Sequence, residues 1–313
     1  MRYSIVVPVY RNEASIYRLL DVLSSINQEV GGELEVVFVV DGSPDRSFEL
    51  LQNGIEQLSF PAQLLALSRN FGSFAAIRAG LTAARGEFFG VMAADLQEPP
   101  ELLISFFRHL NADECDVAIG TRYGRSDPLV SRIASQVFWG LYRRIIVPEM
   151  PDGGVDIFGC NRAFRDELLK LEESRSSLIA LIFWLGFRRK FVGYTRLVRT
   201  EGKSAWTFRK KIDYMLDSVF AFTDYPIKML FRFGLIGSAL SAVLGSLVLI
   251  GHVAGKIVVP GYAATMMVSL FFGALNLLGL GLVGTYAWRG YENSKARPSS
   301  VVAIRKSNCK GGV

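Results

Sequence analysis

Short apolar runs alternate along the first 120 residues with segments in which apolar positions recur at helical spacing. The apolar runs predict strands at residues 3–7, 34–40, 63–67, 88–92 and 115–119. The segments between them predict helices, including one at 12–26 that Asn12 caps and one at 73–84. Wholly apolar strands are typical of parallel strands that are buried on both faces. The pattern therefore predicts an α/β fold with a doubly wound, mostly parallel sheet.

Polar side chains follow the predicted strands at the point where each strand ends. They form four clusters: Asp41 with Asp45, residues 68–72, Asp95 with Gln97, and Arg122. In an open α/β sheet, ligands bind at the carboxyl ends of the strands, so four polar clusters on one edge predict a nucleotide-diphosphate site. The first helix is not opened by G-x-G-x-x-G and the chain has no Walker sequence, which disfavours dinucleotide and P-loop sites.

The segment 91–100 is the centre of this prediction. Asp95 and Gln97 follow an apolar run, and the pair Pro99 and Pro100 opens the next helix, where a missing N–H costs nothing. A carboxylate and an amide oxygen are hard donors that suit Mg²⁺ or Mn²⁺ held against a diphosphate. The alternative is a polar turn that only caps the following helix.

The strand–helix pattern weakens after residue 122. Residues 130–147 are amphipathic and rich in aromatic and Arg side chains, and 190–198 predict a further strand. A basic amphipathic helix predicted at 206–222 carries several aromatic side chains and suits a membrane interface. Pro226 is expected to break the chain after this helix.

The apolar residues are concentrated late in the chain. Half of the 313 residues are hydrophobic and the mean hydropathy is +0.28, which is high for a soluble enzyme. Residues 233–251 and 257–288 carry no charge, and each run can supply the roughly 20 apolar residues that a membrane helix needs. The alternative is a pair of buried core helices, which a small domain could hardly cover.

The net charge of +6 is concentrated around these two apolar segments. Basic residues precede the first segment and follow the second: Arg209, Lys210, Lys211, Lys228, Arg232, and then Arg289, Lys295, Arg297, Arg305, Lys306, Lys310. The loop between the segments holds only His252 and Lys256. The positive-inside rule therefore places both termini in the cytoplasm, and the basic charge is read as attraction to anionic lipid, not to nucleic acid.

Two further features narrow the class of protein. Met1 leads directly into a predicted strand, so no signal peptide is expected. The three cysteines, Cys115, Cys160 and Cys309, are scattered and odd in number, which fits neither a disulfide framework nor a zinc site.

Three motifs occur in order along the chain. They are I-V-V-P-V-Y-R-N-E at 5–13, V-D-G-S at 40–43 and D-L-Q-E-P-P at 95–100. Together they resemble the family 2 glycosyltransferases of the GT-A fold, and among these the polyisoprenyl-phosphate glycosyltransferases, which include dolichol-phosphate mannose synthases and bactoprenol glucosyltransferases. The segment 199–206 and the two apolar segments are similar to the bactoprenol branch. The resemblance covers nearly the whole chain.

The resemblance implies a domain organisation. A cytoplasmic GT-A domain, Rossmann-like with a mostly parallel sheet, would occupy 1–205, and interfacial amphipathic helices 206–228. A transmembrane hairpin would occupy 229–290, with helices at about 232–253 and 264–288, followed by a cytoplasmic tail at 291–313. The protein would be a multi-pass protein of the inner (plasma) membrane. A homo-oligomer is also compatible, in which a tail strand at 301–304 pairs with a neighbouring copy.

The resemblance also implies an activity. The enzyme would transfer a single sugar, with inversion and with a divalent metal, from a nucleotide diphosphate sugar to polyprenyl (undecaprenyl) phosphate. UDP-glucose is favoured by the bactoprenol-like segments, and UDP-N-acetylhexosamines and GDP-mannose stay open. The product, a polyprenyl-phosphate sugar, would serve surface glycan modification.

Site residues follow from the matching motif positions. The implied nucleotide-binding residues are Pro8, Tyr10, Glu13, Asp41 and Ser43, and the metal ligands, Mg²⁺ or Mn²⁺ being the ion, are Asp95 and Gln97. The acceptor phosphate would contact Arg122, Arg132 and Ser135, and a loop carrying Arg199 and Ser204 would close over the diphosphate. Guanidinium groups suit phosphate oxygens because they bind them bidentately.

The implied catalytic residues are Asp95 and Asp156. Asp156 matches a carboxylate that acts as a base or orients the sugar, and we favour orientation because a lipid phosphate is already anionic at neutral pH. A histidine base is not expected, since the chain has only His109 and His252. A structural role for Asp156, and a solvated position for Arg132, are the alternatives.

One position departs from the family pattern. Many relatives carry Asp-x-Asp-x-Gln, but Ala93 stands where the first Asp would be. The missing carboxylate predicts an active enzyme with an altered metal shell. The two alternatives are a non-catalytic subunit that binds nucleotide sugar and a processive polysaccharide synthase. A synthase would need more membrane helices and a downstream Gln-x-x-Arg-Trp, which the chain lacks.

Overall fold

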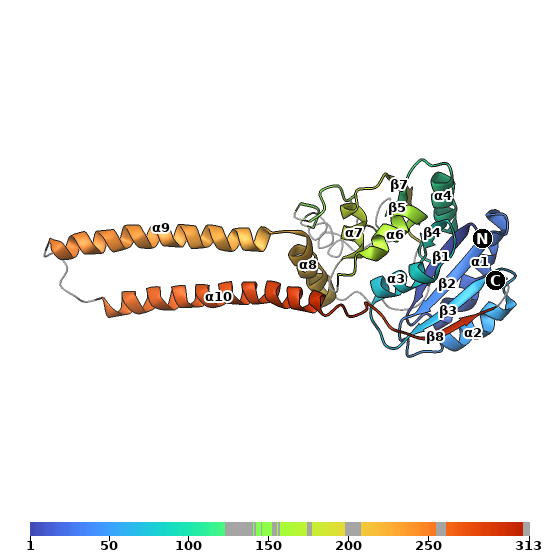
Figure 1. The fold of residues 1–313 in the computed structure, drawn as a ribbon, viewed down its shortest axis with the longest axis horizontal. Helices are drawn as coiled ribbons and strands as arrows, with labels where there is room; N and C mark the ends of the chain where they lie inside the picture. The colour runs from blue at the N-terminus through green and yellow to red at the C-terminus, as the bar shows by residue number, and fades with distance from the viewer. Residues whose placement is uncertain are drawn as a thin grey trace. The chain divides into compact units, whose positions relative to one another are not determined.

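The computed structural model describes residues 1–122, 140, 142–144, 146–151, 155, 157–173, 177–197, 208–254 and 261–308 (Figure 1). The chain forms two compact units, Met1–Tyr214 with Arg297–Val313, and Met215–Ala296. Each unit is described by itself below.

The first unit is built on an eight-stranded sheet with the order β7-β5-β6-β4-β1-β2-β3-β8. The strands are β1 Tyr3–Val9, β2 Leu34–Val40, β3 Ala62–Leu67, β4 Phe88–Val91, β5 Val117–Arg122, β6 Phe158–Asn161, β7 Arg189–Tyr194 and β8 Val302–Ser307. β1 to β4 pair in parallel, and so do β5 and β7, whereas β6 and β8 run antiparallel to their neighbours. The predicted doubly wound, mostly parallel sheet is confirmed.

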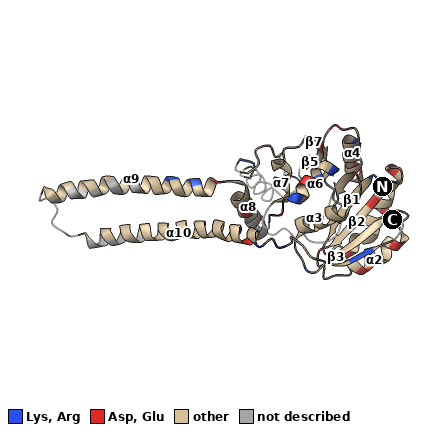
Figure 2. Ribbon diagram, in the orientation of Figure 1, with Lys and Arg blue, Asp and Glu red and all other residues tan. Residues whose placement is uncertain are grey.

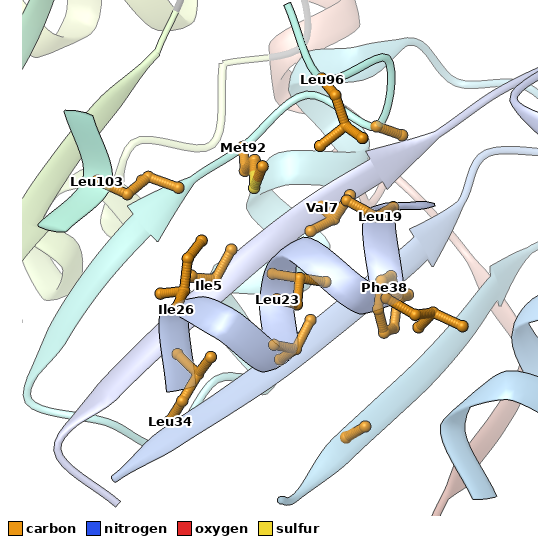
Figure 3. Packing of buried hydrophobic residues seen from close by; sticks show 14 of the residues in the cluster. Ile5, Val7, Leu19, Leu23, Ile26, Leu34, Phe38, Met92, Leu96 and Leu103 are labelled. Carbon is orange, nitrogen blue, oxygen red and sulfur yellow. The ribbon is translucent and has the colours of Figure 1, made fainter. Parts of the chain in front are cut away.

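Helices cover both faces of this sheet. They are α1 Ile16–Glu29, preceded by a 3-10 turn at Glu13–Ser15, α2 Ser47–Gln57, α3 Ser73–Ala83, α4 Pro100–Asn111, α6 Arg162–Lys170 and α7 Leu178–Trp184. The apolar side chains of α1, α2 and α4 pack with one face of the strands, as Figure 3 shows for Leu19, Leu23, Phe38 and Leu103. On the other face α3 lies so close that a Cβ on Gly80 would come within 2.2 Å of Val6.

A buried polar network closes the edge of the sheet at which the parallel strands begin. Glu35, with 1% of its surface exposed, accepts hydrogen bonds from Ser4 Oγ at 2.9 Å, Gln63 Nε2 at 2.9 Å and the Arg85 N–H at 2.8 Å. A buried carboxylate is tolerated only when it is bonded in this way. This network ties three neighbouring strands together and belongs to the stability of the sheet.

Two local predictions were wrong, the Asn12 cap and the bounds of β5. The Asn12 side chain accepts from the Tyr10 N–H at 3.1 Å and does not cap a helix, because the chain first makes the 3-10 turn. Arg122 lies within β5, which starts and ends later than predicted since its ladder with β7 extends to Tyr194. The predicted break after the amphipathic helix is present at residues 223–224, and Pro226 lies in the first turn of the next helix, α9 (Tyr225–Val253), where proline is tolerated. The predicted tail strand is present as β8, and it pairs with β3 of its own sheet.

The second unit contains most of α8 (Phe208–Phe222), together with α9 (Tyr225–Val253) and α10 (Tyr262–Ser294). Gly237 lies opposite the Phe272 side chain and Gly279 opposite the Leu230 side chain, so the two long helices run antiparallel. Many of their large apolar side chains are exposed, for example Phe231 at 71% and Leu277 at 71%. Charged residues gather near the start of α9 and the end of α10 (Figure 2).

One stretch of the described helices, Phe271–Ser294 of α10, is long and apolar enough to cross a membrane, and only 6% of its most apolar window is buried. The first predicted span lies inside α9. The two-span hairpin stays a prediction.

Arginine side chains join α3 to α6 reciprocally. Arg78 of α3 donates to the carbonyl oxygens of Leu168 and Leu169 at 3.0 and 3.1 Å, where α6 ends. Arg165 of α6 donates in return to two carbonyl oxygens at the end of α3. These bonds satisfy carbonyl groups that a helix end leaves without partners.

Replacing Arg78 with Met should therefore lower the stability of the first unit by about 1–3 kcal/mol, since two carbonyl groups lose charged donors. The measurement is thermal unfolding of the detergent-purified full chain. Arg46→Met is the matched control, because the Arg46 guanidinium is exposed and forms a surface ion pair with Glu49, and its loss should leave the midpoint almost unchanged. Equal midpoints for the two variants would contradict the assignment.

Candidate functional site

The carboxyl ends of six strands meet at one edge of the sheet. β1 to β5 and β7 share one direction, while β6 and β8 run the opposite way and begin at this edge. The chain adds β2 and β3 on one side of β1 and then returns to place β4 on the other side. Ligands bind at such a reversal of strand order, so the loops after β1, β2 and β4 define the candidate site.

The loops after β1 and β2 are joined by four hydrogen bonds in which backbone N–H groups donate to side-chain oxygens. The pairs are Arg11 to Ser43 at 2.8 Å, Asn12 to Ser47 at 3.2 Å, Glu13 to Asp45 at 3.1 Å and Arg46 to Glu13 at 3.0 Å. Arg11 itself has a φ of 56°, a left-handed conformation that is unusual for a side-chain-bearing residue. The two predicted nucleotide-binding residues Glu13 and Ser43 therefore lie on neighbouring loops, and the hydrogen bonds between these loops hold both residues in place.

Asp45 is the centre of this pair of loops. It accepts from Ser43 Oγ at 2.6 Å and Ser47 Oγ at 2.9 Å in addition to the Glu13 N–H. Partial burial acts to raise its pKa, but the hydrogen bonds from Ser43, Ser47 and the backbone together lower the pKa below its ordinary value. The sequence pattern placed Asp45 at this edge without indicating that it organises the loops.

Asp41 joins the loop after β2 to the loop after β3. Its buried carboxylate accepts from the backbone N–H groups of Phe71 at 2.7 Å and Gly72 at 2.8 Å, directly before α3. Gly42 next to it has a φ of 58°, and a Cβ there would lie 2.4 Å from the Arg69 carbonyl carbon. Asp41 thus has a clear structural role at the predicted nucleotide site, and only glycine fits beside it.

Asp95 and Gln97 lie on the loop after β4. Leu96 between them has a φ of 53°, and its side chain belongs to the apolar cluster under α1 (Figure 3). The loop is tied to the start of α1 because Ser15 Oγ donates to the Ala94 carbonyl oxygen at 2.8 Å. The burial of Leu96 fixes a left-handed backbone at the residue that separates the two predicted metal ligands.

The segment after β7 also reaches this loop. The Leu197 N–H donates to the Gln97 carbonyl oxygen at 2.8 Å, and the Arg196 guanidinium donates to the Gln97 side-chain oxygen. Arg196 was not among the predicted site residues. Arg196 falls inside the strand predicted at 190–198, whereas β7 ends at Tyr194. Nothing in the sequence pattern indicated a site role for it, and its partner 99 residues away is visible only in the fold.

The remaining predicted residues divide into two groups. Pro8 lies in β1 and Tyr10 just after it, with the Arg11 guanidinium 5.3 Å from the Tyr10 ring centre, and Arg122 ends β5 at the same edge. The others, Arg132, Ser135, Asp156, Arg199 and Ser204, lie outside the described residues.

Asp95 and Gln97 offer a divalent metal one carboxylate and one side-chain amide oxygen. Within the described parts of the chain, no three His, Cys, Asp or Glu side chains gather as a metal site. Mg²⁺ commonly takes one or two carboxylates and completes its shell with water and substrate phosphates. Asp95 and Gln97 therefore fit a metal that is held mainly by a bound diphosphate, and they do not form a cage that would bind it alone.

The fold and this edge define a protein of the GT-A glycosyltransferase class. The model of glycosyl transferase family 2 matches residues 4–171, more than half of the chain, and the chain belongs to this family. Members of this family are enzymes that transfer sugars, so the chain is a glycosyltransferase. The predicted family resemblance is confirmed.

Three similar proteins extend the comparison. An uncharacterized glycosyltransferase of Synechocystis sp. is 31% identical, over 96% of this chain and 94% of its own. The bactoprenol glucosyl transferase of Shigella phage SfX is 27% identical, over 98% of this chain and 100% of its own. The mannosyltransferase PcManGT of Pyrobaculum calidifontis, solved with GDP-Man and Mn²⁺, has a TM-score of 0.50 and 16% identity, covering 93% of this chain and 84% of that one. This last likeness shows the fold.

The lowered pKa of Asp45 predicts a pH dependence. A carboxylate with a lowered folded-state pKa contributes stability above its unfolded pKa and loses it as the pH falls through the folded value. Asp45→Asn should cost about 1–2 kcal/mol at pH 7, and the difference from the unmodified chain should shrink only below pH 3.8.

Denaturant unfolding at a series of pH values measures this difference. Asp21→Asn is the matched control, because Asp21 is exposed on α1, and it should have little effect at any pH. A cost of Asp45→Asn that already fades between pH 7 and pH 5 would contradict the pKa direction.

Proposed function

We propose that the protein transfers one sugar from a nucleotide diphosphate sugar, with UDP-glucose favoured, to a polyprenyl phosphate at the cytoplasmic face of the membrane. The observation that carries the proposal is the end-to-end likeness to a bactoprenol glucosyl transferase, which includes the two long C-terminal helices. The converging loops at the β1/β4 reversal support a nucleotide site in the first unit.

In this proposal the loops after β1 and β2 hold the nucleoside. Pro8 and Tyr10 would contact the base, while Glu13, Asp41 and Ser43 supply acceptors for base N–H groups and ribose hydroxyls. Each of the last three already accepts a backbone hydrogen bond, so the nucleotide meets oxygens whose positions are fixed before it binds. Fixed acceptors lower the ordering cost of binding.

The transfer joins an oxygen of the lipid phosphate to the anomeric carbon of the sugar. The bond from that carbon to the diphosphate breaks with inversion, and the electron pair leaves with the nucleoside diphosphate. Arg122, Arg132 and Ser135 would hold the acceptor phosphate, and Asp156 would orient the sugar. The acceptor oxygen is already anionic, so this proposal requires no strong base.

The diphosphate would lie over Asp95 and Gln97, with Arg199 and Ser204 closing over it. A divalent metal held by Asp95 and Gln97 would offset the charge on the leaving diphosphate. Ala93 in place of a second carboxylate favours a shell completed by the substrate.

The long helices α9 and α10 would anchor the enzyme as a two-span hairpin with both termini cytoplasmic. Their exposed apolar side chains suit the hydrocarbon of a bilayer. The basic residues at the start of α9 and after α10 suit anionic headgroups (Figure 2).

The test is nucleotide release by the detergent-purified chain with Mg²⁺ or Mn²⁺, over UDP- and GDP-sugars, with and without undecaprenyl phosphate. We expect release from one donor only when the lipid is present, together with a lipid-linked sugar product. Nucleotide binding without any release would instead support the non-catalytic subunit that Ala93 suggests.

Asp95→Asn should lower the transfer rate on the order of 100-fold or more, because one carboxylate is lost beside the diphosphate. The same lipid-dependent assay measures it, and the exposed Asp21→Asn is the control with unchanged rate. Full activity of Asp95→Asn with an unchanged metal requirement would refute the assigned role.

A further inference from the structure

Gln97 is unusual among the residues of the site because the segment after β7 engages both of its oxygens. Leu197 bonds its carbonyl oxygen at 2.8 Å, and Arg196 bonds its side-chain oxygen. Gln97 is 8% exposed, so these bonds hold a nearly buried amide in one orientation. The positively charged Arg196 guanidinium therefore contacts the same Gln97 side-chain oxygen that the proposed function assigns to the divalent metal.

The Arg196 guanidinium has more N–H donors than its bond to Gln97 uses. A guanidinium carries five N–H donors in a rigid plane, and the bond to Gln97 uses one of them. Arg196 is itself exposed at the loop edge of the sheet. A planar group with exposed donors, bonded to Gln97 two residues along the chain from Asp95, suits the oxygens of a phosphate, which it can bind in pairs.

The charges of the loop after β4 favour the same conclusion. Ala93 leaves Asp95 as the carboxylate of the D-x-Q motif, and Arg196 adds one positive charge to this loop through its bond to Gln97. The combination attracts a free divalent cation less than two carboxylates would, because like charges repel. It attracts a diphosphate more strongly, since a positive group is in place before any metal arrives.

We propose that Arg196 is a diphosphate-binding residue of this enzyme. In the nucleotide-free protein its guanidinium bonds the Gln97 side-chain oxygen, and when the donor binds it turns to the phosphate that is bonded to the sugar. The inference rests on the proposed function and adds to it a binding residue outside the motifs. Arg196 donates hydrogen bonds and transfers no proton: the electron pair of the broken carbon–oxygen bond stays on the leaving diphosphate, where the guanidinium stabilises it.

The test compares the binding of UDP and UMP, and of GDP and GMP, to the full chain by calorimetry, in EDTA and with Mn²⁺. Arg196→Met should weaken binding of the preferred diphosphate roughly 10- to 100-fold in EDTA, while the monophosphate changes little, because only the diphosphate carries the contacted group. Arg196→Lys should fall between the two, since it keeps the charge and loses the planar fork.

Arg108→Met is the matched control. It removes the same charge from an exposed position in the last turn of α4, outside the loops that would hold the nucleotide. It should leave both affinities unchanged, which separates a direct contact from a general loss of positive charge. Thermal unfolding of each variant shows whether the loss of the Gln97 bond has unfolded the loop.

Three results would overturn the assignment. Arg196→Met could retain the diphosphate affinity, could lose diphosphate and monophosphate affinity equally, or could change the affinities no more than Arg108→Met does. If the unmodified chain forms the lipid-linked sugar in these cases, only the role of Arg196 fails. If the unmodified chain binds neither UDP nor GDP, the proposed function and the role of Arg196 fail together.

Discussion

The parallel register of the central strands is the constraint on which the site depends. β1, β2 and β4 are buried on both faces, so their apolar side chains fix the register against helices on either side, and a shift by one residue would exchange the two faces. Because these strands share a direction, the loops that follow them begin at the same edge. The reversal of strand order at β1 then leaves room for a ligand between the loops.

The protein uses several of its own polar side chains to hold this edge together. Asp41 joins the loops after β2 and β3, Asp45 joins those after β1 and β2, and Ser15 joins α1 to the loop after β4. Gln97 extends the series to the segment after β7. Side chains that the sequence suggests as ligand-binding groups thus also hold the loops of this edge in place. A nucleotide binding here would meet acceptors whose positions are already set, which favours specificity over adaptability.

The tail returns to the same sheet after the long helices. β8 adds to the outer edge of β3, and Asn308 bonds the backbone of residues 55, 60 and 62. The strand covers an edge that would otherwise present unpaired backbone groups. Loss of the tail strand would therefore expose the backbone groups of the β3 edge.

The sequence by itself determined the parallel strands β1 to β4, the parallel sheet and the edge at which polar residues gather, because burial on two faces leaves a local apolar pattern that needs no knowledge of the partner strands. It also indicated the family, through motifs that are short and continuous in the chain. Only the tertiary structure decided the direction of β8, the extent of β5 through Arg122, and the contact of Arg196 with Gln97. It also decided that Asp41 and Asp45 bond the backbone of other loops. These features join residues far apart in the chain, and a hydrogen bond between distant segments leaves no periodic trace in either of them.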